Sequence, residues 1–107
     1  SLDLSNFDTS KVTSMDYMFG YCSGLTSLDL SNFVTSKVTD MGDMFYGCRS
    51  LETLDLSGWD TSKVKYTTDM FKGCSALTTI RMVGCTTETI NKIKALKPSS
   101  ATTIVTE

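Results

Sequence analysis

The chain has 107 residues, which is the length of one domain, and a globule of this size buries about 65% of its unfolded surface. Its 10 basic and 12 acidic residues give a formal net charge of -2, which supplies no field to attract nucleic acid or anionic lipid. Histidine is absent, so the usual general base and metal ligand is missing. No apolar run approaches the roughly 18 residues of a membrane span. These features argue against an enzyme, a nucleic-acid-binding protein and a membrane-spanning protein.

The sequence repeats itself with a period of 26 residues. The heptapeptide SLDLSNF that opens residues 1–26 also opens residues 27–52, and the two blocks are identical at 17 of 26 positions without a gap. Residues 53–78 match the second block at 14 of 26 positions, and a degenerate fourth copy occupies residues 79–85. A fixed period of this length is typical of repeat architectures.

The spacing of the apolar residues changes halfway through each repeat. Leu28 and Leu30 alternate with polar residues, which predicts a strand, whereas the later apolar residues follow helical spacing. Thr13 and Thr39 are expected to cap these helices. Because parallel strands need a crossover, each repeat is predicted to form one coil of a right-handed solenoid. In this α/β fold a parallel sheet of about four to five strands lies on one face and short helices lie on the other.

Stacked coils are expected to bring equivalent residues into columns about 4.8 Å apart. The predicted core columns are Leu2, Leu28, Leu54 and Ile80; Leu4, Leu30, Leu56 and Met82; Phe7, Phe33, Trp59 and Cys85; Val12, Val38 and Val64; Met18, Met44 and Met70; and Phe19, Phe45 and Phe71.

Two motifs in each repeat resemble a known family. The segment from Leu25 to Phe33 follows the leucine-rich-repeat template L-x-x-L-x-L-x-x-N, with Phe at the terminal Asn position. With F/W-D-T-S-K-V-T and M-x-x-M-F-x-x-C added, the unit resembles the 26-residue repeat of BspA-like leucine-rich-repeat bacterial surface proteins over residues 1–85. The third unit departs from this pattern by writing Lys65-Tyr66-Thr67 where the earlier units have Thr-x-Met. The resemblance implies a secreted or cell-surface protein of a host-associated bacterium whose repeats serve adhesion or protein binding.

The chain after residue 85 loses the repeat pattern. An apolar helical stripe is followed by Pro98 as a stop signal. The stripe consists of Ile90, Ile93 and Leu96. Residues 102–106 could add a fifth strand, so residues 86–107 are interpreted as a C-terminal cap on a solenoid of residues 1–85. No similar cap precedes Ser1, and we therefore expect the C-terminal piece of a longer array that self-associates through its uncapped N-terminal end.

The sulfur-containing residues are interpreted as core. Cys22, Cys48 and Cys74 share one phase of the repeat, Cys85 falls in the Phe/Trp column, and no C-x-x-C motif is present. Buried free thiols are favoured over metal ligands, and a bridge between Cys74 and Cys85 is the one disulfide left open. Methionines spaced i, i+3 could in principle bind copper(I), but core packing is the favoured interpretation. No cofactor or metal is expected.

One column of polar residues is the strongest candidate site. Asp3, Asp29 and Asp55 alternate with inward leucines and should line the concave face of the sheet, where Arg81 ends the column. The candidate ligand contacts on this face are Asp3, Ser5, Asp29, Ser31, Asp55, Ser57 and Arg81. The alternative is a solvated face that binds nothing and only adds solubility.

Three functional classes remain, in descending order. The first is a non-enzymatic adhesion or protein-interaction module, whose partner would be a host extracellular or surface protein. The second is a structural spacer that displays other domains of a longer surface protein, and the third is an enzyme. Four tyrosines on the crossover side are either half-exposed contacts or a cover for the helices, and the sequence leaves both open. They are Tyr17, Tyr21, Tyr46 and Tyr66.

Overall fold

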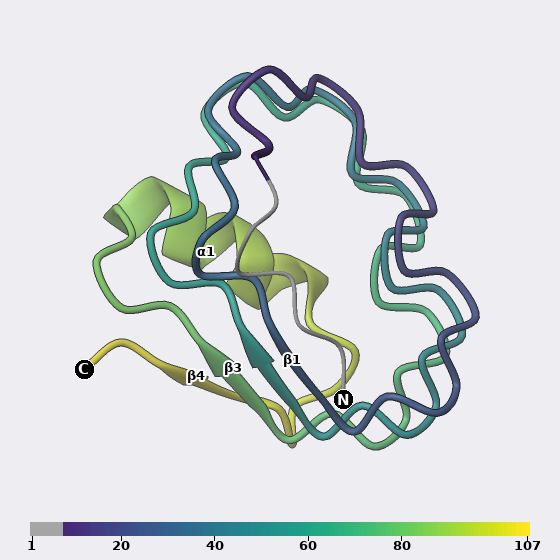
Figure 1. Ribbon diagram of the computed structural model, residues 1–107. Helices are drawn as coiled ribbons and strands as arrows, with labels where there is room; N and C mark the ends of the chain where they lie inside the picture. Colours follow the sequence, from purple (N-terminus) through teal and green to yellow (C-terminus); the bar gives the residue numbers. More distant parts are fainter. Residues whose placement is uncertain (1–7) are drawn as a thin grey trace.

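Four parallel strands and one helix make up the regular structure of residues 8–107, the part of the chain that the computed structural model describes. The strands are β1 (Ser27–Asp29), β2 (Thr53–Asp55), β3 (Thr79–Arg81) and β4 (Thr103–Val105), and they lie in that order in one sheet. The helix is α1 (Thr87–Leu96), between β3 and β4. Figure 1 shows the chain following nearly the same path three times, with the strands side by side. The structure is therefore a small α/β domain.

The 26-residue period sets the register of the first three strands. Leu28 pairs with Leu54, and Leu54 pairs with Ile80, so each residue lies beside the residue 26 positions later. The last pairing joins Ile80 to Ile104, which lies 24 positions later because α1 intervenes. The strand expected within residues 102–106 is present, whereas the strand expected around Leu2 and Leu4 lies outside the described residues.

On the inward side of the sheet, the residues of the predicted columns form a hydrophobic core. Leu54 and Ile80 are almost fully buried, and Trp59 is only 1% exposed. The Trp59 indole Nε1 donates to the carbonyl oxygen of Leu30 at 3.0 Å, so the one polar atom of this side chain is satisfied. The buried members of the strand columns are Leu28, Leu54 and Ile80; Leu30, Leu56 and Met82; and Phe33 and Trp59.

The prediction of short helices on the other face is wrong for the described residues. The segments 15–21, 41–47 and 67–73, called the turn segments below, consist of successive turns. In an α-helix each N–H bonds to the carbonyl four residues earlier. Here every second N–H instead donates to the next repeat. The first set of donors and acceptors is Met15 to Asp40 at 2.8 Å, Tyr17 to Gly42 at 3.1 Å, Phe19 to Met44 at 2.9 Å and Tyr21 to Tyr46 at 2.6 Å.

Backbone angles explain why these segments do not form helices. Asp43 and Asp69 both have a φ of 55°, and Gly47 and Gly73 have φ values of 76° and 85°. Such positive values are incompatible with a right-handed helix. The phenylalanines of these segments are nevertheless buried in the core, as predicted, and the rings of Phe19, Phe45 and Phe71 stack. The centroid distances are 5.9 Å for Phe19 to Phe45 and 5.4 Å for Phe45 to Phe71.

Two further expectations for this side of the molecule need correction. Thr13 and Thr39 cap no helix, since the Thr39 amide and hydroxyl both donate to the Thr13 carbonyl, at 2.8 and 3.2 Å. Met18 is 38% exposed, although Met44 and Met70 of the same column are buried. The threonine that was expected to begin a helix instead joins neighbouring repeats.

A column of buried threonines, which the sequence did not reveal, also joins the repeats. The Thr35 hydroxyl accepts a hydrogen bond from the Asp60 amide at 2.8 Å and donates to the Asp60 carbonyl at 3.0 Å. Thr9 makes the same pair of bonds to Val34. Thr61 completes the column, and its amide donates to the Thr89 hydroxyl of α1 at 3.1 Å. The Thr9 and Thr35 hydroxyls satisfy backbone groups where the main chains do not pair directly, whereas the Thr61 hydroxyl donates to the Thr89 hydroxyl.

Helix α1 packs over the third repeat. The Thr86 hydroxyl accepts from the Thr89 amide at 3.2 Å and so caps the helix, which ends shortly before Pro98 as predicted. Ile93 is buried, and the Lys92 ammonium donates to the Val64 carbonyl at 2.9 Å. Within residues 8–107, no helix has the length and apolar character needed to cross a membrane.

Candidate functional site

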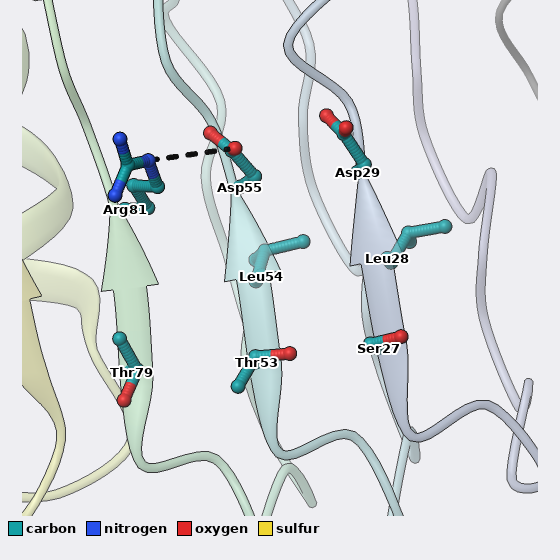
Figure 2. Close-up of a pocket in the computed structure, with 8 residues that line it drawn as sticks. All are labelled: Ser27, Leu28, Asp29, Thr53, Leu54, Asp55, Thr79 and Arg81. Atoms are coloured by element: carbon teal, nitrogen blue, oxygen red, sulfur yellow. Dashed lines mark ion pairs between the residues drawn. The ribbon is translucent and has the colours of Figure 1, made fainter.

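The outward side chains of three neighbouring strands form the candidate site. Successive side chains of a strand point to opposite faces, so the residues that flank each buried central residue face outward. Figure 2 shows them in two rows, with acidic and basic groups at one end of the strands and hydroxyls at the other. The first row is Asp29, Asp55 and Arg81, and the second row is Ser27, Thr53 and Thr79.

Between these rows lies a shallow depression of about 300 Å³. Leu28 and Leu54, although largely buried, contribute to its lining between the polar rows. This volume is at the lower end of the range for ligand pockets, and the surface follows the sheet. The depression therefore suits a protruding side chain or a backbone segment of a partner better than an enclosed small molecule.

The acidic row carries one ion pair. Asp29, Asp55 and Arg81 are aligned in adjacent strands, and Arg81 Nε lies 3.8 Å from Asp55 Oδ2. The Arg81 side chain is 52% exposed and that of Asp55 27%, so solvent screens the pair and its contribution to stability is at most about 1 kcal/mol. The pair offsets part of the repulsion between the two neighbouring carboxylates. Asp29 has no such cation among the described residues.

The serines that follow the strands hold the carboxylates in place. The Ser31 amide and hydroxyl both donate to Asp29 Oδ1, at 2.9 and 2.6 Å. These hydrogen bonds lower the pKa of Asp29, first through the hydroxyl and then through the amide. The Ser57 amide donates to Asp55 Oδ1 at 3.0 Å, and the Ser57 hydroxyl accepts from the Val83 amide at 3.0 Å. Ser31 and Ser57 therefore stabilise the turns, in addition to any contact with a ligand.

The structure brings together three of the predicted contact residues and adds others. Asp29, Asp55 and Arg81 line the depression, whereas Ser31 and Ser57 lie beyond the strand ends. Asp3 and Ser5 lie outside the described residues. Sequence reasoning did not include Ser27, Thr53 or Thr79 among the candidate contacts. Their position two residues before Asp29, Asp55 and Arg81 in the repeat was the available signal. The role of this face in ligand binding stays a prediction.

The chemistry of the site is that of hydrogen bonding and charge. Two carboxylates accept, one guanidinium donates, and three hydroxyls do both. No cluster of three or more His, Cys, Asp or Glu side chains suited to a metal ion occurs in residues 8–107. Such a face can recognise polar side chains and backbone of another protein.

All four cysteines are free thiols, including Cys74 and Cys85, for which a disulfide had been left open. The Cys48 thiol donates to the Phe19 carbonyl and the Cys74 thiol to the Phe45 carbonyl, both at 3.1 Å. The neighbouring Cys48 thiol, together with burial, raises the pKa of the Cys74 thiol. Burial also raises the pKa of Cys22 and Cys85. Cys48 and Cys74 therefore act as buried hydrogen-bond donors, whereas Cys22 and Cys85 are only half-buried.

Comparison with known proteins places the chain in a family. No curated protein and no solved structure is significantly similar to it. One family model matches residues 1–97, which covers all three full repeats and all of α1. The chain thus belongs to the family described as "Mycoplasma protein of unknown function, DUF285".

Proposed function

We propose that this chain is a non-enzymatic protein-interaction or adhesion module that uses the outward face of its sheet. The observation that carries the proposal is the depression between β1, β2 and β3, in which carboxylates, a guanidinium and hydroxyls converge. Extended faces built from repeated units are a common means of binding protein ligands.

The architecture behind this proposal is a leucine-rich-repeat-like solenoid of the BspA-like type. Supporting it are the strand register of 26 residues and the leucines that recur in one buried column. The proposal also includes a secreted or cell-surface location, and a partner among host extracellular proteins. Both follow from the resemblance of the repeats to that family.

A structural spacer is the second candidate, and one observation favours it. On the sheet face the outward residues other than Arg81 are small, and the carboxylate oxygens of Asp29 and Asp55 already accept bonds from Ser31 and Ser57. Aromatic anchors, which dominate many binding surfaces, are absent from the described residues of this depression. A spacer would display other domains and have no ligand of its own.

Calorimetry against a panel of extracellular-matrix and serum proteins tests the proposal. The test variant is Asp29→Asn with Asp55→Asn, which keeps the shape of the face and removes two charges. The matched control is Asp8→Asn with Asp60→Asn, because these carboxylates accept the same type of bond from Ser10 and Ser62 but lie outside the depression. Saturable binding that is lost only in the test variant supports the recognition face. Equal binding by both variants, or no binding to any panel member, favours the spacer.

A further inference from the structure

Three tyrosine rings form a continuous aromatic surface on the turn segments. The ring centroids of Tyr17 and Tyr46 are 6.3 Å apart, and those of Tyr21 and Tyr46 are 5.4 Å apart. Tyr17 is 51% exposed and Tyr21 66%. We call these three residues the tyrosine surface. The turn segments that carry it run down the right side of Figure 1, away from the strands. None of the three tyrosines lines the depression on the sheet face.

The backbone fixes the positions of two of the rings. Tyr17 and Tyr21 have φ values of 57° and 61°, which bulky residues rarely adopt. The Tyr21 ring lies over Gly47, where an added Cβ would approach Cδ1 of Tyr21 to 3.1 Å. Because the backbone bonds from Tyr17 and Tyr21 to the next repeat hold this arrangement, little order has to be gained when a partner binds.

Carboxylates lie next to the Tyr17 end of the tyrosine surface. Around Gly42, an added Cβ would lie 3.2 Å from Asp40 Oδ1 and 3.6 Å from Asp16 Oδ1, so these two carboxylates are close neighbours. Asp43 and Asp69 occupy equivalent positions in adjacent repeats. Loss of hydration, followed by the charges of Asp69, Asp16 and Asp40, raises the pKa of Asp43.

Little positive charge balances these carboxylates within the chain. Among residues 8–107 the one ion pair is that of Asp55 with Arg81, on the sheet face. Of the groups that act on Asp43, only Lys72 is basic. Asp43 is also the charge that acts most strongly on the Tyr17 hydroxyl, whose pKa it raises. The Tyr17 hydroxyl therefore lies close to Asp43 and Asp16, which form no ion pair among residues 8–107.

We propose that the tyrosine surface binds a lysine- or arginine-bearing segment of a partner protein. A cation over a tyrosine face is attracted by the ring, and the neighbouring carboxylates add Coulomb attraction for the same charge. A protein segment fits better than a small quaternary ammonium, because aromatic cages for such ligands enclose the cation. Tyr17 and Tyr21 instead stand more than half exposed, in a row across two repeats.

Fluorescence anisotropy with a fluorescein-labelled decapeptide of alternating Gly and Lys tests the inference on the full 107-residue chain. The test variant is Tyr17→Ser with Tyr21→Gly, where glycine is the residue that Gly47 and Gly73 provide at the equivalent positions. Removing two of the three rings is expected to raise the Kd about tenfold. The control is Tyr66→Ser, because Tyr66 is 61% exposed but lies in neither of these ring pairs. Circular dichroism of each variant verifies that it is folded.

A second pair of variants tests the charges. Asp16→Asn with Asp43→Asn is expected to weaken peptide binding severalfold, whereas Asp8→Asn with Asp60→Asn removes equal charge elsewhere and is expected to leave the Kd unchanged. An unchanged Kd in the double tyrosine variant would overturn the inference, since charge alone would then attract the peptide. Binding of a Gly-Glu peptide with similar affinity would also overturn it. Complete displacement of the Gly-Lys peptide by excess choline chloride would overturn the assignment to a protein segment.

Discussion

The sheet side and the turn side of each repeat both bond to residues about one repeat length later in the chain, but their backbones differ in geometry. On the sheet side, short extended strands place one leucine inward and two polar residues outward. On the other side, the turn segments alternate bonds within a repeat with bonds to the next one, and positive φ values recur at fixed positions. The comparison teaches that the sheet side accepts many outward side chains, whereas the turn side restricts which residues fit.

The core beneath the turn segments provides the strongest test of this comparison. Phe45 is fully buried between the rings of Phe19 and Phe71, so Phe45→Ala leaves a large cavity in the middle of the stack. We expect a loss of about 3–5 kcal/mol in the free energy of unfolding, measured by urea denaturation. Phe45→Leu is the control, and a loss of less than 1 kcal/mol in Phe45→Ala would show that the turn side contributes little to stability.

The buried threonine column is expected to be next in importance. Thr35→Val keeps the shape of the side chain but removes the hydroxyl that bonds to both the amide and the carbonyl of Asp60. The expected loss is about 1–3 kcal/mol in thermal or urea unfolding, because these backbone groups lose their partner. Thr35→Ser keeps the hydroxyl and should be affected less. Equal destabilisation by the two substitutions would contradict the role assigned to the hydrogen bonds.

Alanine substitutions of two glycines with positive φ, one on each side, compare how much each side tolerates an added side chain. Gly73 has a φ of 85°, and an added Cβ would meet the Gly47 Cα at 3.1 Å. Gly58, at the turn after β2, has a φ of 78° but open space around it. Gly58→Ala is expected to lose about 1 kcal/mol and Gly73→Ala about 2 kcal/mol, since only the latter adds a contact with backbone. If both lost the same amount, backbone strain alone would limit the turn segments.

Substitution of one aspartate on each side is expected to give the smallest change in stability, and the change has opposite signs on the two sides. The lowered pKa of Asp29 means that its ionised form stabilises the fold above the ordinary aspartate pKa, and this contribution is lost as pH falls through the lowered value. The raised pKa of Asp43 means that its ionisation disfavours the fold, so stability recovers as pH falls through the raised value. Asp29→Asn should therefore lower the urea midpoint at neutral pH, by about 0.2–1 kcal/mol in stability, and Asp43→Asn should raise it.

Measurements of both variants from about pH 7 to about pH 2 check these signs, because falling pH protonates both aspartates, Asp43 before Asp29. The differences from the unsubstituted chain should shrink at the lower pH. A stabilising Asp29→Asn or a destabilising Asp43→Asn at neutral pH would contradict the electrostatic difference between the two sides.

The strands and their register could be predicted from the sequence because they depend on a simple pattern. A period of 26 places Leu28 beside Leu54, and alternation decides which side chains point inward. The same reasoning predicted that Asp29, Asp55 and Arg81 share one row of the candidate site. The final helix was also predictable, since its apolar stripe and Pro98 are local signals.

The turn segments could not be predicted in the same way. Met41, Met44 and Phe45 have the spacing of a buried helix face, and successive turns closed by hydrogen bonds between residues three apart bury the same positions. The positive φ of Asp43 has no clear signal in the sequence, although Gly47 and Gly73 hint at the second position. No local pattern around Thr35 indicates its partner, since Asp60 lies 25 residues away.

The tyrosine surface illustrates a different limit. Tyr17, Tyr21 and Tyr46 occupy three different positions of the repeat, so no single column predicts that their rings meet. Only the folded backbone brings Tyr46 between the other two. The sequence left open whether these side chains were contacts or a cover, and the structure shows that Tyr17 and Tyr21 remain exposed.

The long span of the bonds between repeats has a consequence for how the chain folds. The Trp59 indole bonds to a carbonyl 29 residues earlier, and the turn segments pair residues about 25 apart. Loops of that length must close before such contacts form, and chains with a high contact order fold in milliseconds to seconds. Trp59 is the only tryptophan in the sequence, and it is buried in the core. Its fluorescence emission should therefore report this slow closure directly.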